Sequence, residues 1–253
     1  MNRWQWFAIC LLVVGFFIAL APARLITQQF NQRPSTAAQI RLLQPSGSVW
    51  NGAAELIIDS QPLGRVSWRF LPSALIKLTA GLEVRIEATD YHANGRLLKP
   101  LGRSVEALDV FAELDASALQ RWLAPYDIHP SGALTVEHLD LTGLELLATG
   151  WPASLSANGE ARFTGGDLSY RLAGKTTHVE LPPLTASIAT EEQLPTLRVT
   201  EIGKDLPLIF ARLTHRGSVA IGITQGFTVL VGQPWPGSEP DHKVVLEVEE
   251  LLI

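Results

Sequence analysis

Two alternating segments flank a short helical stretch in residues 65–88, whose sequence is RVSWRFLPSALIKLTAGLEVRIEA. Apolar and polar residues alternate over 65–70 and again over 82–88, which is the period of a strand with one buried face. Between these segments, Ser73 is a capping-type residue that opens a helical run of a few residues. Residues 65–88 therefore predict a strand, a short helix and a second strand.

The same order of elements recurs in residues 108–142. An alternating segment over 108–114 leads to a predicted helix over 116–123, and a second alternating segment follows over 133–142. Asp115 is the candidate N-cap of this helix, because its carboxylate can accept hydrogen bonds from the free amides of the first turn. Two repeats of this kind stack more naturally into one sheet than into two domains.

Glycine and proline divide the rest of the chain into short segments of strand character. We predict a turn at residues 45–47, a bulge rather than a hairpin turn at Asn51-Gly52, and further turns at Asn158-Gly159 and Gly165-Gly166. The predicted fold is mainly β: a curved antiparallel sheet, either open or forming half of a barrel, with one or two short helices. Further strands are predicted over residues 39–43, 48–59, 186–189, 196–200, 218–224, 227–231 and 243–250.

An almost unbroken apolar run, WFAICLLVVGFFIALA, occupies residues 6–21 and follows Arg3. Such a run directs export and, when it is retained, anchors the chain in a membrane. We expect a retained N-terminal transmembrane helix, because Trp4 and Trp6 suit a membrane interface; cleavage near Ala21-Pro22-Ala23 is the alternative. The predicted anchor side chains are Trp6, Phe7, Leu11, Leu12, Val13, Val14, Phe16, Phe17, Ile18 and Leu20.

The chain then divides into an anchor over 1–24, a tether over 25–38 and a β-rich domain over 39–253. The tether is predicted because its residues are polar, include Pro34 and show no sustained period. The apolar run places the β-rich domain in the periplasm or outside the cell. The one cysteine, Cys10, lies in the apolar run, so the exported part needs no disulfide.

Composition and motifs argue against several classes of function. The net charge is -5 and no basic stretch interleaved with aromatic residues occurs, so we expect no nucleic-acid partner. The hydrophobic content of 47% and the charged content of 18% favour a sheet with much apolar surface. The six histidines lack metal-binding spacing and no nucleophile elbow occurs, so we expect no metal, no cofactor and no enzymatic activity. Asp109, Glu113 and Asp115 are interpreted as a solvated strand face.

Several short motifs together resemble one known family: GSVWNG (47–52), the segment 63–68, GDLSY (166–170), LPPL (181–184), GQPWPG (232–237) and EELL (249–252). In their order the chain resembles protein N of the type II (general) secretion pathway, GspN. The resemblance implies an accessory inner-membrane component of the apparatus that moves folded periplasmic proteins across the outer membrane of Gram-negative bacteria, without catalytic residues. The fold is also similar to that of AsmA-like proteins, whose curved sheets expose an apolar concave face.

Two functional hypotheses follow. The first is an accessory secretion component, held in the inner membrane by one N-terminal span, that binds other type II secretion components in the periplasm through exposed strand edges. The alternative is a membrane-tethered protein that binds or transfers lipid on an apolar concave sheet. The groove which the alternative requires is predicted at Leu56, Ile58, Val84 and Ile86.

Overall fold

The computed structural model describes residues 20–31, 40–58, 61–144, 155–172, 174–214, 218–237 and 239–251. These residues form a thirteen-stranded antiparallel sheet, a three-stranded sheet and several short helices. The large sheet has the strand order β1-β2-β3-β4-β5-β6-β8-β9-β12-β13-β14-β15-β16, and the small sheet has the order β11-β10-β7.

Most strands are between seven and twelve residues long, and the helices are short. The strands of the large sheet are β1 (Ile40–Gly47), β2 (Asn51–Ile58), β3 (Gln61–Phe70), β4 (Thr79–Glu87), β5 (Tyr91–Pro100), β6 (Val105–Asp115), β8 (Ala133–Leu144), β9 (Ser156–Phe163), β12 (Leu184–Glu191), β13 (Leu194–Glu201), β14 (Pro207–Leu213), β15 (Ser218–Thr224) and β16 (Val244–Leu251). The small sheet contains β7 (Ile128–Pro130), β10 (Gly166–Leu172) and β11 (Lys175–Leu181). The helices are α2 (Arg24–Asn31), α3 (Pro72–Leu75), α4 (Gln120–Leu123) and α5 (Gln225–Leu230), with 3-10 turns at Ala116–Leu119 and Ala124–Tyr126.

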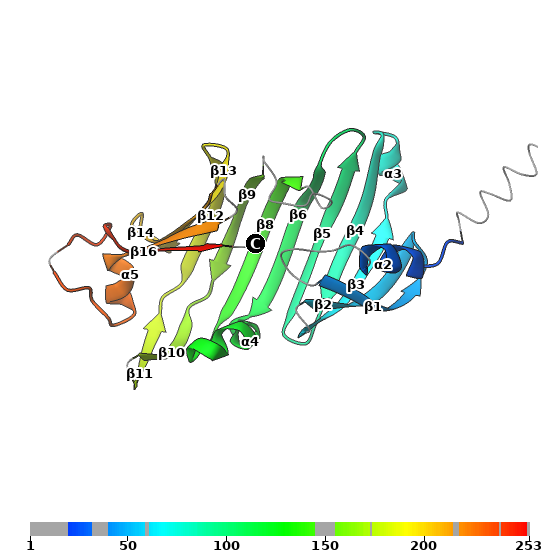
Figure 1. Cartoon of the computed structure of the whole chain (residues 1–253). Helices are drawn as coiled ribbons and strands as arrows, with labels where there is room; N and C mark the ends of the chain where they lie inside the picture. Colours follow the sequence, from blue (N-terminus) through cyan, green and yellow to red (C-terminus); the bar gives the residue numbers. More distant parts are fainter. Residues whose placement is uncertain are drawn as a thin grey trace, which may run out of the picture.

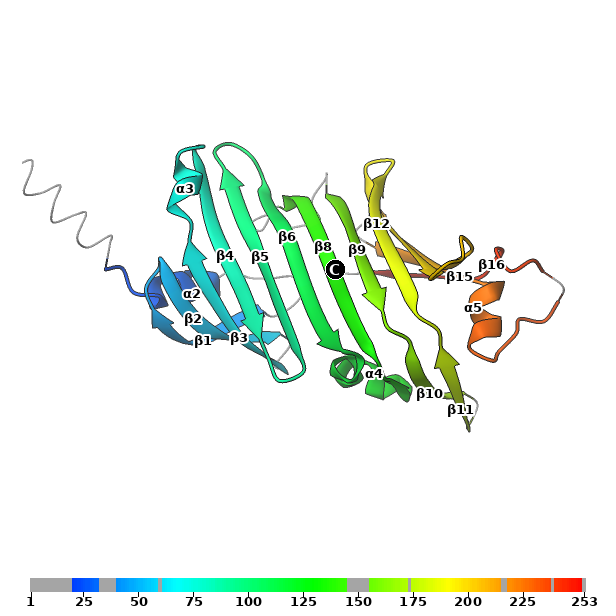
Figure 2. The same cartoon turned by 180° about the vertical axis from the view of Figure 1, so that it is seen from behind.

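The large sheet is open and curved. Strands β1 and β16 are its two edges, so the sheet does not close into a barrel. Helix α2 and strand β16 lie on the same side of the middle strands, in front of them in Figure 1 and behind them in Figure 2. The side that carries α2 is therefore the concave side. The prediction of a mainly β fold with a curved antiparallel sheet is confirmed, in its open form.

The internal repeat predicted from the sequence is present. In the first copy β3, α3 and β4 follow one another, and in the second copy β6, the helical turns over 116–123 and β8 do so. The two strands of each copy pair directly. Asp115 Oδ1 accepts a hydrogen bond from the Ser117 amide at 2.8 Å, which confirms the predicted N-cap. The predicted cap of the first copy is wrong, because α3 begins at Pro72 without a side-chain cap.

The turn of the first hairpin lies three residues later in the sequence than predicted. Ser48 donates its amide to the Asn51 carbonyl at 2.9 Å, and the Ser48 hydroxyl accepts from the Asn51 amide at 3.1 Å. Gly52 is not a bulge but a regular position of β2, where a Cβ atom would lie 2.6 Å from the indole of Trp68. The irregularity lies in β1 instead, between Leu43 and Ser46.

Two glycine pairs that were predicted as turns have other roles. Asn158-Gly159 lies inside β9, where a Cβ atom on Gly159 would approach the carbonyl oxygen of His138 in β8 to 2.5 Å. Gly165-Gly166 is the point at which the chain leaves β9 in the large sheet and enters β10 in the small sheet. Both predictions are wrong, because these glycines permit close backbone approach rather than a chain reversal.

The segment predicted as a strand over 227–231 is mostly helical. Thr224, fully buried, donates its hydroxyl to the Leu208 carbonyl at 3.0 Å and accepts at its Oγ1 from the Phe227 amide. This N-cap begins α5 and outweighs the strand preference of the aromatic and β-branched residues that follow.

The first part of the predicted tether is a helix in contact with the sheet. Thr27 of α2 is 3% exposed, and the Asn31 side chain donates to and accepts from the backbone of Leu42 in β1, both at 2.8 Å. Residues 32–38 of the predicted tether lie outside the described residues. The division of the chain at residues 24 and 38 stays a prediction.

Candidate binding surface

One side of the large sheet is apolar on every strand; we call it the apolar face. Residues that pair directly across antiparallel strands lie on the same side of a sheet, so the register assigns each side chain to a side. The apolar face includes Leu42, Leu56, Val66, Val84, Leu97, Val110, Leu139, Ala161, Ile188, Val199, Ile209, Ile221 and Val248, one from each strand in order.

Most of the apolar face lies open. Its small residues, such as Ala107 and Ala161, are buried between larger neighbours, but aliphatic side chains such as Leu139 and Ile188 are only half-buried. A side chain in a two-layered core would be fully buried, and the packed interior of a protein leaves few gaps. The large sheet is thus a single layer over most of its width, within the part of the chain that the structure describes.

The exception is the end formed by β1–β4, where the start of α2 covers the apolar face. Ala23, Ala54, Val66 and Trp68 form a buried cluster there. The Trp68 indole Nε1 donates to the carbonyl oxygen of Val49 at 3.1 Å. This cluster fixes the position of α2, because Ala23 also donates its amide to the Gly47 carbonyl at 3.1 Å.

The four predicted groove residues lie beside this cluster. Leu56, Val84 and Ile86 pack against it from β2 and β4. Ile58 is half-buried near the far end of β2, where it pairs with Ile40 and Gln61. The structure therefore brings three of the four residues together. Their role in lipid binding stays a prediction.

The sequence prediction missed the extent of the apolar face. Apolar and polar residues alternate at residues 134–141 with the same period as at 82–88. The alternation is interrupted at Glu137-His138, where the pairing of β8 with β9 is irregular. That interruption moves Leu139 back to the side of Val136 and hides the pattern from a simple reading of period two.

The opposite side of the sheet is polar and carries ion pairs between neighbouring strands. Arg162 Nε lies 3.1 Å from Glu137 Oε1. The Arg69 guanidinium, which donates to Glu83, holds the pKa of that carboxyl below its usual value, with a smaller contribution from the charge of Arg85. The two arginines are solvent-exposed, so these ion pairs contribute little to stability.

The three carboxylates that the sequence interpreted as a solvated face have separate partners. Asp109 pairs with Arg96, and Glu113 lies 3.4 Å from the imidazole of His92. Asp115 caps the following helical turn, and hydrogen bonds from the Ser117 side chain and amide lower the pKa of its carboxyl. Each of the three carboxylates therefore has its own partner.

Among the described residues, no three His, Cys, Asp or Glu side chains are close enough to hold a metal ion. Nor does any helix in the described ranges have the length and apolar character needed to cross a membrane. Of the predicted anchor side chains only Leu20 is described, and it is exposed; the others lie outside the described residues.

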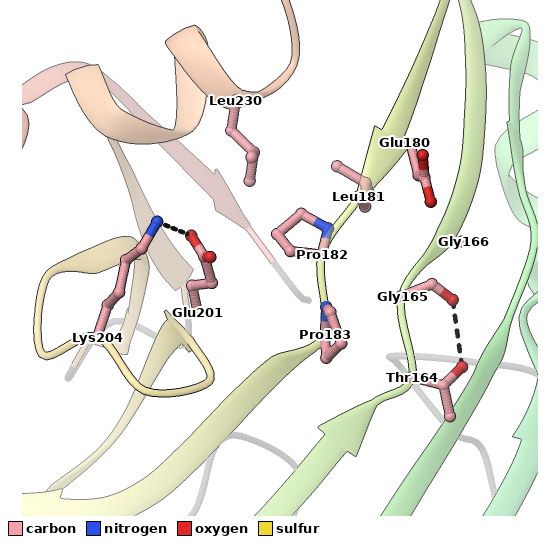
Figure 3. Close-up of a pocket in the computed structure, with 10 residues that line it drawn as sticks. All are labelled: Thr164, Gly165, Gly166, Glu180, Leu181, Pro182, Pro183, Glu201, Lys204 and Leu230. Atoms are coloured by element: carbon pink, nitrogen blue, oxygen red, sulfur yellow. Dashed lines mark hydrogen bonds and ion pairs between the residues drawn. The ribbon is translucent and has the colours of Figure 1, made fainter.

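A pocket of about 740 Å³ opens where the chain passes between the two sheets (Figure 3). Lys204 Nζ on its wall pairs with Glu201 Oε2 at 2.6 Å, and Thr164 Oγ1 donates to the Gly165 carbonyl at 3.2 Å. Among the described residues that line the pocket there is no histidine or cysteine. The lining residues are Thr164, Gly165, Gly166, Glu180, Leu181, Pro182, Pro183, Glu201, Lys204 and Leu230.

Strand β16 offers a second kind of surface. It is the last strand of the large sheet, so its outer backbone groups have no strand partner among the described residues. Val244, Leu246 and Val248 of this strand are exposed. An edge with free backbone donors and acceptors and exposed aliphatic side chains can receive a strand of another chain.

Comparison with known families adds one finding. The family model for type II secretion system (T2SS), protein N matches residues 38–233 of the chain. No curated protein and no solved structure matches the chain significantly. The matched region begins before β1 and includes α5, so it contains the apolar face up to β15.

Proposed function

Because this chain belongs to the type II secretion system protein N family, we propose that it is an accessory component held in the inner membrane, acting by binding in the periplasm. The apolar run at residues 6–21 supports the attachment. The observation that carries the binding role is the apolar face, which crosses all thirteen strands and is covered by α2 only at the β1–β4 end.

The bound partner is an apolar segment of another secretion component. Contiguous apolar surface on a soluble domain marks an interaction site, and each Å² removed from water contributes roughly 25 cal/mol. The half-buried side chains of the middle strands supply such surface without a change of fold. The free edge of β16 supplies backbone hydrogen bonds beside it.

Site-specific crosslinking in cells tests this proposal with a matched pair of positions. A photoreactive amino acid is placed at Ile188 on the apolar face, or at Ser187, which is exposed on the opposite side of the same strand. We expect crosslinks to a secretion component from Ile188 and not from Ser187. The proposal is wrong if both positions give the same products, or if Ile188 gives none.

The apolar face also favours a second function, the binding of acyl chains. Lipid would occupy the middle strands around Leu139 and Ile188 rather than the predicted groove at Leu56 and Val84, because α2 already covers part of the latter. The same crosslinking experiment distinguishes the two functions. A lipid adduct at Ile188, identified by mass spectrometry, supports lipid binding, whereas a protein adduct supports the accessory role.

A further inference from the structure

Four leucine and isoleucine side chains project from one end of the strands; we call them the apolar tip. Leu75, Ile76 and Leu78 belong to α3 and its link to β4, and Leu101 belongs to the β5–β6 turn. Ile76 is 87%, Leu101 81% and Leu78 72% exposed, the highest fractions among the large hydrophobic side chains described. Clustered exposure of this degree marks an interaction site rather than an ordinary surface.

The backbone holds the apolar tip together. The Leu101 amide donates to the Leu78 carbonyl at 3.1 Å, which joins the two loops. Leu78 has a φ of 53°, in the left-handed region that leucine rarely adopts. The fold thus keeps a strained conformation at a side chain that packs little against the rest of the protein, which points to a role outside stability.

The surroundings of the apolar tip are positively charged. Lys77, Lys99 and Arg103 are exposed next to it. Residues 71–82 and 97–105 contain no aspartate or glutamate, although the chain as a whole has a net charge of -5. Aliphatic side chains ringed by cations are complementary to the interface of a bilayer with anionic headgroups.

The apolar tip also lies at the end of the strands where the predicted anchor joins the domain. The Val49 amide donates to the Ala21 carbonyl at 2.9 Å, so the chain arrives beside the β1–β2 turn. In that turn the Trp50 carbonyl accepts a hydrogen bond from the Phe70 amide at 2.6 Å. The Trp50 and Phe70 rings also meet edge to face, with a centroid distance of 4.9 Å. Phe70 ends β3, two residues before α3 begins at Pro72. In Figure 1 both α2 and α3 lie at the β1–β4 end of the large sheet.

We propose that the apolar tip inserts into the interface of the membrane, with Lys77, Lys99 and Arg103 against anionic lipid headgroups. It is a second attachment point of the domain, and it rests on the inner-membrane location proposed above. Two attachment points fix the tilt of the sheet, so the apolar face has a defined direction relative to the bilayer. A single attachment point would leave that direction free.

A depth measurement on the full chain tests the contact. In a Cys10→Ser background, Ile76→Cys carries an environment-sensitive fluorophore, and the chain is reconstituted in vesicles of anionic and zwitterionic phospholipids. The matched control is Tyr126→Cys, which is 70% exposed at the opposite end of the strands. We expect a blue-shifted emission and quenching by acyl-chain quenchers at position 76, and neither at 126. Equal, water-like emission at both positions overturns the contact.

Two further measurements test the role of the cations and the membrane attachment separately. Lys77→Glu, Lys99→Glu and Arg103→Glu together should remove most of the quenching on anionic vesicles, and unchanged quenching overturns the role of these cations. Flotation of the same samples reports the anchor. A chain that floats with a water-exposed label at position 76 overturns only the tip contact, whereas a chain that does not float overturns the proposed inner-membrane attachment.

Discussion

The two parts of the large sheet reach stability in different ways. At the covered end, formed by α2 and β1–β4, Trp68 and Val66 are buried beneath Ala23. In the open middle, formed by β5, β6, β8, β9 and β12, buried positions belong to small residues such as Ala161, and large aliphatic side chains remain half-exposed. The covered end resembles an ordinary core, whereas the open middle depends on its backbone ladder and on close strand approach.

This difference separates stability from binding. Side chains that are already buried contribute to the free energy of unfolding and have little accessible apolar area left for contact with a partner. Side chains that stay half-exposed contribute less to folding, and the remaining area becomes available on binding. The open middle is therefore the part of the apolar face to test for partners, and the covered end is the part to test for fold stability.

The largest effect should come from Trp68→Ala at the covered end. Removing the indole leaves a cavity under α2 and an unpaired Val49 carbonyl, so the free energy of unfolding should fall by about 3–5 kcal/mol. Ile188→Ala in the open middle should cost about 1–2 kcal/mol, because part of the side chain is already in water. Urea unfolding measures both. Equal losses would break the comparison between the two parts.

Gly159→Ala should have the next largest effect. The added methyl would lie 2.5 Å from the His138 carbonyl and push β8 away from β9, at a cost of about 1–3 kcal/mol. Gly222→Ala is the matched strand control, since its nearest contact is a flexible Val244 side chain at 3.3 Å. That control should change stability by less than about 0.5 kcal/mol. If both variants behave alike, close strand approach does not stabilise the open middle.

Asn31→Ala should weaken the contact of α2 with strand β1. It removes two hydrogen bonds to the Leu42 backbone, worth about 1 kcal/mol in all because the site is exposed. Hydrogen exchange should accelerate in β1 and β2 and stay unchanged in β8. Gln28→Ala, an exposed position on the same helix, is the control and should leave exchange unaltered. Faster exchange in β8 would contradict the independence of the two parts.

The smallest effect concerns the cap at the border of the open middle. Because hydrogen bonds from Ser117 lower the pKa of Asp115, the carboxylate stabilises the fold above its ordinary pKa, and this contribution disappears as pH falls through the lowered value. Asp115→Ala should therefore be less stable than the natural protein at pH 7 and equal to it at strongly acid pH. Asp115→Asn, which retains a cap, should show little of this pH dependence. A difference that persists in acid would exclude the titration of Asp115 as its cause.

The parts of the fold predicted correctly from the sequence are those determined by local pattern. Alternation at 65–70 and 82–88 identified β3 and β4, and Asp115 was placed correctly as a cap. The errors arose where contacts distant in sequence decide the conformation. Gly52 looks like a bulge residue until the Trp68 indole is placed over it, and Gly159 looks like a turn residue until β8 lies beside it.

The candidate surface shows the same limit. Three of the four predicted groove residues do lie together, because alternation within β2 and β4 assigns them to one side. The continuation of the apolar face through β8 depends on the pairing irregularity near Glu137, which is a property of two strands and not of one. Likewise, Thr224 caps α5 while its hydroxyl donates to the Leu208 carbonyl in another strand.

The strand order of the large sheet has a consequence for how the protein folds. Strands join the sheet in the order in which they occur in the chain, and only β7, β10 and β11 are set aside in the small sheet. Most of the loops to be closed are therefore short, which keeps the entropic barrier to those pairing steps low. A polypeptide emerging slowly from a ribosome or a translocation channel can add one hairpin after another to a growing edge, before its C-terminal strands are available.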